Sequence, residues 1–239
     1  MHRFAYNRST LRTQGGNSVS LEPKEIFCRL FAAYGPQHWW PGETPFEIIV
    51  GAVLTQNTAW NNVARAITNL KAADLLSLEA LLRAPEDVVR QLLAPSGFYN
   101  VKYRRLRHLL EHLARDEVWV RLQRAPLEEA RAELLAVHGI GLETADSILL
   151  YAFERPTFVV DAYTRRLLSR LGEGWAEKAP YEAVRRYFME RLPREVPLYN
   201  EFHALIVTNS KAHCRKRPHC EGCPLAEDCA AQRAGVLRV

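Results

Sequence analysis

Long apolar runs are missing from this chain of 239 residues. No stretch reaches the roughly 18 consecutive apolar residues that a membrane-spanning helix needs. Residues 1–20 are polar and lack the apolar core of a secretory signal. We therefore expect an intracellular protein with no membrane partner, in which residues 1–20 form a flexible basic tail.

Strand patterns, internal repeats and low-complexity tracts are also nearly absent. Hydrophobic residues make up 48% of the chain, enough for a real core, and they recur with helical spacing between Pro, Gly and Ser breaks. The sequence therefore predicts an all-α fold. After a first helix capped by Ser20, the expected helices are 46–54, 60–71, 78–83, 86–93, 101–115, one that Pro126 starts and that leads into the hairpin, 143–153, 162–171, 180–191 and 198–210.

Cysteine is scarce, and its distribution excludes a disulfide framework. Cys28 stands alone and is expected to be a small core residue. The other four form the C-terminal pattern C-x5-C-x2-C-x5-C, made by Cys214, Cys220, Cys223 and Cys229. Four thiolates this close can surround one metal centre, and zinc is an option on geometry alone.

The excess of positive charge is small. A net charge of +5 and a pI near 9.0 permit a nucleic-acid partner without demanding one. Three basic residues lie together in the first cysteine loop, where they could face phosphate: Arg215, Lys216 and Arg217.

The stretch His138–Asp161, HGIGLETADSILLYAFERPTFVVD, organises the chain. Gly139 and Gly141 flank one aliphatic residue, which favours a tight turn before a helix. The N–H groups at such a helix start can bind an anion such as a DNA phosphate. An ordinary helix–helix connection is the simpler interpretation of the two glycines alone. The extended Phe158–Val160 segment then places Asp161 at the start of another helix.

Gly139-Ile140-Gly141, Thr144-Ala145-Asp146 and Val160-Asp161 together resemble a known signature. It is the helix-hairpin-helix plus Gly/Pro-Asp motif of the endonuclease III superfamily of DNA glycosylases. The resemblance spans roughly residues 39–229. It implies that Asp161 is the catalytic carboxylate beside the deoxyribose, although Asp161 could also be only a helix N-cap.

Glu143 departs from one part of the superfamily. Enzymes that also cleave the DNA strand have lysine there, in G-x-G-x-K-T-A, and this lysine forms a Schiff base. This chain has G-I-G-L-E-T-A. Because a carboxylate cannot form a Schiff base, the resemblance implies hydrolytic base removal with little or no lyase activity, with Glu143 beside Asp161 at the site.

Three further stretches are similar to the 3-methyladenine DNA glycosylase branch: Trp39-Trp40-Pro41, Leu54–Thr58, and Gly97-Phe98-Tyr99-Asn100 with Lys102. This similarity implies a base pocket of Trp39, Trp40, Pro41 and Trp60. It also implies DNA contacts by Gln56, Phe98, Lys102, Gly139 and Gly141, together with the basic loop of Arg215, Lys216 and Arg217. Gln56 and Phe98 would fill the gap left by a flipped nucleotide, although Phe98 could be a core residue and Gln56 a simple helix end.

The resemblance also implies that Cys214, Cys220, Cys223 and Cys229 hold a [4Fe–4S] cluster. The family pattern has six residues in the first gap and this chain has five. Some members of the 3-methyladenine branch lack these cysteines altogether.

We therefore expect two helical lobes, residues 36–149 ending in the hairpin and residues 21–35 plus 150–239 with the cluster. The expected protein is a monomeric DNA glycosylase of base excision repair, acting on double-stranded DNA with a damaged base, most simply an N-alkylated purine such as 3-methyladenine. One alternative is an endonuclease III-type oxidised-pyrimidine glycosylase and apurinic-site lyase. Another is a DNA-damage-binding protein without catalysis.

Overall fold

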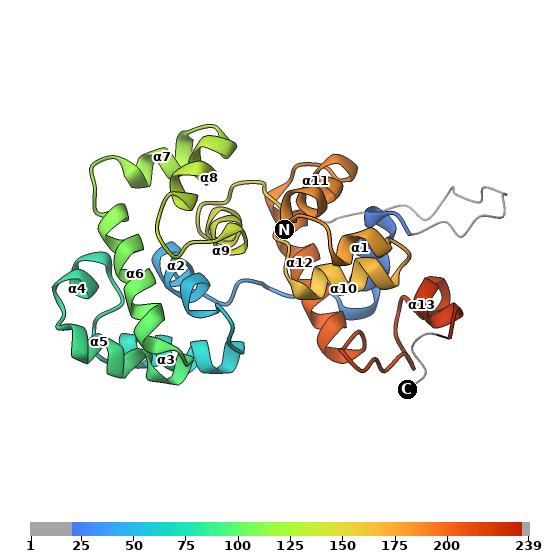
Figure 1. Cartoon of the computed structure of the whole chain (residues 1–239), viewed down its shortest axis with the longest axis horizontal. Helices are drawn as coiled ribbons and strands as arrows, with labels where there is room; N and C mark the ends of the chain where they lie inside the picture. The colour runs from blue at the N-terminus through green and yellow to red at the C-terminus, as the bar shows by residue number, and fades with distance from the viewer. Residues whose placement is uncertain (1–20, 236–239) are drawn as a thin grey trace.

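The computed structural model describes residues 21–235, and this part of the chain is helical, with no strand (Figure 1). The all-α prediction is confirmed. The first eight α-helices are α1 (Pro23–Tyr34), α2 (Pro45–Leu54), α3 (Trp60–Ala72), α4 (Leu78–Arg83), α5 (Glu86–Leu93), α6 (Tyr99–Leu113), α7 (Val118–Arg124) and α8 (Leu127–Leu135). The remainder are α9 (Leu142–Ser147), α10 (Ala162–Arg170), α11 (Tyr181–Arg191), α12 (Val196–Ala212) and α13 (Ala230–Arg233).

Four short irregular helices join these elements. Three are 3₁₀ turns, η1 (Ala94–Ser96), η3 (Gly174–Glu177) and η4 (Ala226–Asp228), and η2 (Ile148–Ala152) is a π-helical turn. No helix in residues 21–235 has the length and apolar character needed to cross a membrane.

The first hydrophobic core is built around α2. This helix begins where Thr44 caps it, because the Glu47 amide donates to Thr44 Oγ1 at 3.1 Å. Nearly all of its residues are buried, and it packs against α3, α6, α9 and η2. An apolar helix buried on every side must lie at the centre of its lobe, so its C-terminal end can hold polar groups in a fixed place.

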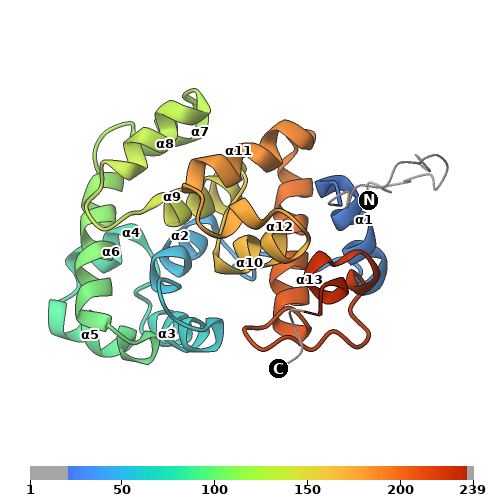
Figure 2. The ribbon, with the colours of Figure 1, turned by 45° about the vertical axis from the view of Figure 1, so that its right-hand side comes forward.

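The second core joins α1, near the N-terminus, to the C-terminal part of the chain. The long helix α12 packs against α1 and α10 (Figure 2). Phe158, from the extended segment before α10, stacks on Phe188 of α11 with ring centroids 4.0 Å apart. This segment is almost completely buried, which fixes the start of α10.

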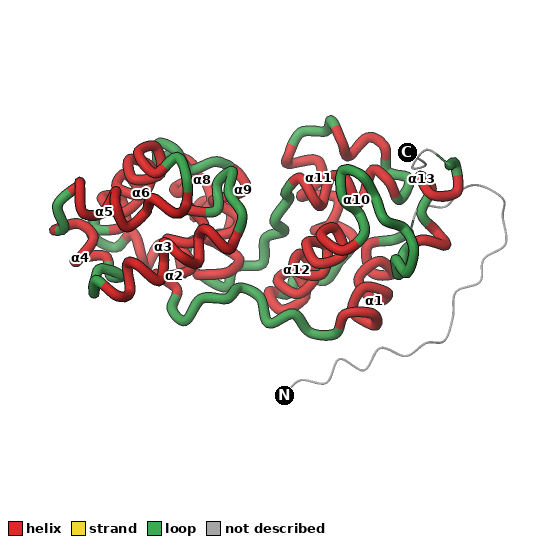
Figure 3. Tube along the Cα trace, turned by 90° about the horizontal axis from the view of Figure 1, so that it is seen from below, coloured by secondary structure: helices red, strands yellow, loops and turns green. Residues whose placement is uncertain are grey.

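Two chain segments connect the cores, one between α1 and α2 and one between η2 and α10 (Figure 3). A buried ionic network also crosses between them. Asp146 of α9 accepts two hydrogen bonds from Arg131 of α8, at 2.8 and 3.1 Å, and one from Thr157. Arg185 of α11 donates to Thr157 at 2.8 Å. The lobe boundaries expected from the sequence, 36–149 and 21–35 plus 150–239, remain a proposal.

The helices differ from expectation in several places, among them α13, which was not predicted. The run expected to be one helix over 143–153 is α9 followed by η2, because the Phe153 amide bonds to the Ile148 carbonyl five residues earlier, at 3.2 Å. Helix α7 was not predicted. Ser20 lies outside the described residues, and the N-cap of α1 is Glu22, so the predicted cap is wrong.

Candidate active site

A cleft of about 980 Å³ opens between the C-terminal end of α2, the hairpin before α9, the start of α10 and one face of α12. Eight of the residues singled out from the sequence line it: Trp39, Trp40, Gln56, Trp60, Gly139, Gly141, Glu143 and Asp161. Pro41 is exposed and does not line the cleft. Phe98, Lys102 and the basic cysteine loop also lie elsewhere. The cleft therefore brings together both expected carboxylates and all three expected aromatic rings.

Of the two hairpin glycines, only Gly139 has a backbone conformation and surroundings that require glycine. Gly139 has φ of +94°, and a Cβ there would lie 2.3 Å from Cγ of Arg105, which packs over it. Gly141 has φ of −94°, which other residues adopt, and open space surrounds the place of its Cβ. An exposed Gly141 leaves the first amides of α9 accessible from the cleft, as an anion would require.

Gln56 holds the hairpin to the end of α2. Its side-chain amide donates to the Gly139 carbonyl at 3.1 Å and to Thr144 Oγ1 at 3.0 Å, and its oxygen accepts from Arg105 at 2.6 Å. Gln56 thus lies in the cleft, but its polar atoms already have protein partners.

Asp161 is the N-cap of α10. Its Oδ1 accepts hydrogen bonds from the Thr164 amide at 2.7 Å and from the Thr164 hydroxyl at 2.9 Å. Its Oδ2 lies 3.6 Å from Nε2 of His203. Burial alone would raise the pKa of Asp161, but His203 and the Thr164 N–H and O–H groups outweigh it and lower the pKa below its usual value. The carboxylate is therefore both fixed in direction and ionised, with one oxygen left for another partner.

Glu143 has the opposite electrostatic character. Desolvation within the cleft and the charge of Asp161 raise the pKa of Glu143 to about 7, although the residue as a whole stays open to solvent. Two carboxyl groups in one cleft with pKa values displaced in opposite directions are typical of a catalytic site.

The three tryptophans form one aromatic cluster at the wall of the cleft. Trp40 contacts Trp39 and Trp60 edge to face, with ring centroids 5.4 and 5.1 Å apart. The Trp40 indole also lies over Gly51 of α2, where a Cβ would come within 3.4 Å of its Nε1. These contacts hold the rings in place without closing the cleft.

Phe98 is not a core residue. Its side chain is 72% exposed and its φ is +46°, in the left-handed region that a bulky residue rarely adopts. Strained, exposed aromatic residues of this kind mark functional loops.

The expectation that Lys102 binds DNA is wrong in this structure. Its side chain is 1% exposed, and its ammonium group donates to the Leu54 carbonyl at 2.7 Å and to the Ser96 carbonyl at 2.6 Å. Burial lowers the pKa of Lys102 to about 8. The lysine ties the end of α2 to the loop that carries Phe98, so it supports that loop from inside.

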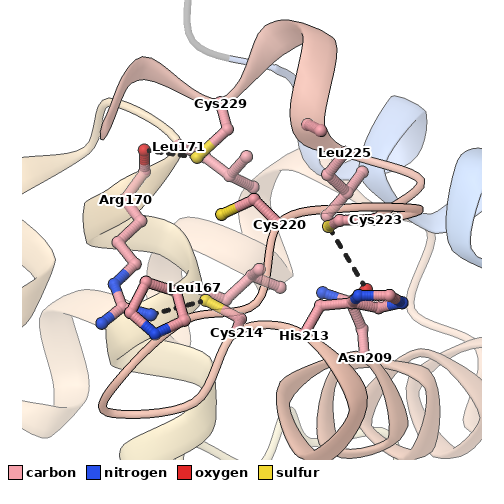
Figure 4. Close-up of a pocket in the computed structure, with 12 residues that line it drawn as sticks. Leu167, Arg170, Leu171, Asn209, His213, Cys214, Cys220, Cys223, Leu225 and Cys229 are labelled. Carbon is pink, nitrogen blue, oxygen red and sulfur yellow. Dashed lines mark hydrogen bonds between the residues drawn. The ribbon is translucent and has the colours of Figure 1, made fainter. Parts of the chain in front are cut away.

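The four C-terminal cysteines line one small pocket beside α10 and α12, and their sulfur atoms face the same space (Figure 4). Within residues 21–235, however, no three such side chains converge closely enough to bind a single metal ion. The zinc and [4Fe–4S] interpretations of these cysteines therefore both stay predictions.

Two arginines of α10 hold the first cysteine loop, and sequence reasoning missed both. Arg170 donates to the Cys214 sulfur at 3.3 Å and to the carbonyls of Arg215 and Lys216 at 2.7 and 3.1 Å. Arg166 donates to the Cys214 carbonyl at 2.7 Å. The exposed basic side chains of this loop therefore project from a fixed backbone.

His203 and Tyr151 are the other site residues that the sequence did not reveal. The available signal was a single histidine within the otherwise apolar run 202–207 of α12. Such a residue is more often a core histidine than a functional one, and only its place beside Asp161 distinguishes it.

Comparisons with known proteins agree with this geometry. Residues 50–194 match the model of the HhH-GPD superfamily base excision DNA repair protein. The candidate DNA repair glycosylase MJ1434 of Methanocaldococcus jannaschii is 47% identical over 212 residues, covering 87% of this chain and 96% of that protein.

Two solved structures show the same fold. The 3-methyladenine DNA glycosylase MagIII of H. pylori, bound to 1,N6-ethenoadenine, superposes with a TM-score of 0.69 at 30% identity, covering 80% of this chain and 98% of that one. A trapped endonuclease III–DNA covalent intermediate has a TM-score of 0.73 at 20% identity, covering 90% and 99%. The chain belongs to the HhH-GPD superfamily of base excision DNA repair glycosylases.

Proposed function

We propose that this protein is a monofunctional DNA glycosylase that flips a damaged base from double-stranded DNA and hydrolyses its N-glycosidic bond. Its substrate is an N-alkylated purine such as 3-methyladenine. The observation that carries the proposal is the composition of the cleft, where an ionised Asp161 lies with three tryptophans and the hairpin carries Glu143 instead of lysine. The 30% identity to MagIII supports the same substrate class.

Asp161 acts on the sugar. As the bond between C1′ and the base breaks, positive charge develops on the sugar ring, and an ionised carboxylate stabilises it. Water then bonds to C1′ and gives up a proton to the carboxylate or to solvent. The electron pair of the broken bond leaves with the base. A 3-methyladenine base is cationic in DNA and leaves neutral, so no acid is needed to protonate it.

The tryptophan cluster recognises the base. A cation placed over a tryptophan ring gains about 0.5–2 kcal/mol relative to a neutral group. Trp39, Trp40 and Trp60 are the rings that would provide this contact, and flat rings favour a planar purine over a saturated pyrimidine. Pro41, exposed outside the cleft, is no longer part of this pocket.

DNA contacts come from elements around the cleft. The amides after Gly141, at the start of α9, face a phosphate, and Phe98 enters the base stack where the damaged nucleotide was. Gln56 reaches the base left opposite the gap by exchanging its hydrogen bonds to Gly139, Thr144 and Arg105 for that base. The loop of Arg215, Lys216 and Arg217 contacts more distant phosphates. We propose that the protein binds as a monomer inside the cell.

We infer that the four cysteines hold a [4Fe–4S] cluster. Their sulfurs line one pocket, and the likeness to endonuclease III supports such a cluster. The chain uses it to hold the basic loop. Purified protein should contain about four irons per chain. One zinc with neither iron nor sulfide, in protein prepared without oxygen, would refute the cluster.

One observation favours a second function, an endonuclease III-type glycosylase and apurinic-site lyase. Lys211 of α12 lines the same cleft, and its amine could replace the missing hairpin lysine. A DNA-damage-binding protein without catalysis is a weaker alternative, because Asp161 is retained with a lowered pKa.

A screen of base release over methylated, deaminated and oxidised duplexes tests the substrate. We expect 3-methyladenine to be released faster than uracil or thymine glycol. A screen in which oxidised pyrimidines are the best substrates would replace this proposal with the endonuclease III function, and no release from any duplex would favour the binding protein.

A further inference from the structure

The second oxygen of Asp161 faces a buried histidine. Thr164 occupies Oδ1 through two hydrogen bonds, whereas Oδ2 lies 3.6 Å from Nε2 of His203, which is beyond hydrogen-bond distance but within reach of an ion pair. His203 is only 5% exposed, and its Nε2 has no hydrogen-bond partner. A buried polar nitrogen without a partner is uncommon, and here its neighbour is the proposed catalytic carboxylate.

The other ring nitrogen of His203 is fixed by Tyr151. The Tyr151 hydroxyl lies 2.6 Å from Nδ1. Burial raises the pKa of Tyr151 well above its usual value, so the hydroxyl keeps its proton. When this hydroxyl donates to Nδ1, the proton of a neutral imidazole must be on Nε2. When the imidazole is doubly protonated, Tyr151 accepts instead. Both of these arrangements direct an N–H at Asp161, and a neutral imidazole protonated on Nδ1 is the one arrangement that would not.

Tyr151 also contacts the wall of the base pocket. Its ring lies 5.1 Å from that of Trp40, between centroids. It belongs to the π-helical turn η2, and such turns occur often at functional sites. A continuous series of contacts thus runs from the tryptophan cluster through Tyr151 and His203 to Asp161.

We propose that His203 is a positioning residue for Asp161, with Tyr151 fixing the imidazole so that its Nε2–H keeps the carboxylate ionised and aimed into the cleft. This inference rests on the catalytic role of Asp161 proposed above. Neither His203 nor Tyr151 needs to touch the DNA.

The charged and polar groups around Asp161 determine how its pKa changes when His203 is replaced. Glu143 of α9 faces Asp161, Lys211 of α12 lines the same cleft, and Thr164 of α10 donates two hydrogen bonds to Asp161. Without His203, burial and the charge of Glu143 both oppose ionisation of Asp161, and the Thr164 hydrogen bonds favour it. The pKa of Asp161 therefore rises in such a variant.

The first test is a carbon-13 titration of the Asp161 carboxyl in the free protein, which does not depend on catalysis. The variants are His203→Gln and Tyr151→Phe. His112→Gln is the matched control, because His112 Nε2 also lies 3.6 Å from a carboxylate, Glu133, and also has no hydrogen-bond partner, but lies in the other lobe. We expect the titration midpoint to rise most in His203→Gln, less in Tyr151→Phe, and not at all in His112→Gln.

The second test is the single-turnover rate of base release between pH 5 and 8. The acidic limb should move to higher pH in His203→Gln, and below its midpoint the ionised fraction of Asp161, and with it the rate, falls about tenfold for each pH unit. A midpoint and a pH profile equal to those of His112→Gln would overturn the inference. If His203→Gln fails to fold, Tyr151→Phe alone decides, since it keeps the ring.

Failure of the inference is distinguishable from failure of the proposed function. If Asp161→Asn keeps near-full turnover, the catalytic role of Asp161 is wrong, whatever the titration shows. If Asp161→Asn is inactive but His203→Gln has the parent profile and midpoint, only the role of His203 is wrong.

Discussion

Two clusters of buried charged residues lie near the segments that connect the two cores, one around Asp146 and one around Asp161. They differ in how many of their polar atoms have hydrogen-bond partners. In the network around Asp146, both carboxylate oxygens accept hydrogen bonds from Arg131, and Arg185 reaches the same group through Thr157. In the cleft, Asp161 keeps one oxygen without a hydrogen bond, and His203 Nε2 has no partner. Paired charges hold helices together, whereas unpaired ones are available to a substrate. The two aspartates therefore have different roles, although both lie close to the hairpin.

Asp146→Asn should have the largest effect, because it should lower the unfolding free energy without lowering the rate of base release. Removing the charge takes away the one fully buried carboxylate beside Arg131 and Arg185, and such losses cost up to about 3–5 kcal/mol of unfolding free energy. The more exposed Glu182 and Glu128 still pair with these arginines and reduce the loss. Denaturant titration measures this. At temperatures where the variant stays folded, base release per folded molecule should be close to that of the parent. A loss below 1 kcal/mol would show that the network is not what holds α8, α9 and α11 together.

Asp161→Asn should show the reverse pattern. Asparagine is as good an N-cap as aspartate, so the unfolding free energy should change little. The rate of base release should fall about 100- to 1,000-fold, as when a transition-state charge partner is removed. Affinity for duplex DNA should persist, because phosphate contacts lie elsewhere. Near-parental turnover on a substrate that the parent processes would mean that Asp161 is only a cap.

Phe98→Ala tests a smaller effect at the edge of the cleft. The side chain is 72% exposed, so its removal should leave stability within about 0.5 kcal/mol. Base release should fall about tenfold, since the stack is no longer held open by a ring. Tyr99→Ala is a suitable control, because Tyr99 is the next residue and is 39% exposed. Equal losses in both variants would show that Phe98 has no special role.

Glu143→Gln should have the smallest effect, on the pH dependence of stability. The folded pKa of Glu143, about 7, lies above its unfolded value of 4.5. The folded state therefore keeps a proton that the unfolded state loses, and stability falls as pH rises from about 4.5 to about 7. The variant should lack this decrease. The unfolding free energy of the variant minus that of the parent should therefore be larger at pH 8 than at pH 4. Solvent exposure reduces its size. If the unfolding free energies of the two proteins changed with pH in the same way, the raised pKa of Glu143 would be contradicted.

The sequence predicted most of the helices, the family and most of the cleft-lining residues, because these depend on local patterns. The family resemblance is confirmed. The hairpin, the Asp161 cap and the three tryptophans each belong to a short stretch of sequence that can be recognised as a motif. Lys102 was misassigned because a lysine on a basic helix gives no sign that its ammonium group turns inward to two carbonyls. His203 and Tyr151 were missed because they meet only when α12 packs against η2, 52 residues away in the chain. Contacts of that kind are fixed by tertiary packing, which no local pattern records.

Borohydride trapping on DNA with an abasic site tests the central claim most directly. The claim is that a cleft with Glu143 on its hairpin performs hydrolysis and stops at the abasic site. The parent should give no covalent protein–DNA product, and strand breaks should appear only after alkali. Glu143→Lys is the positive control, because it places an amine where a Schiff base can form. Efficient crosslinking by the parent, abolished by Lys211→Met, would contradict the account and assign the protein a lyase activity through Lys211.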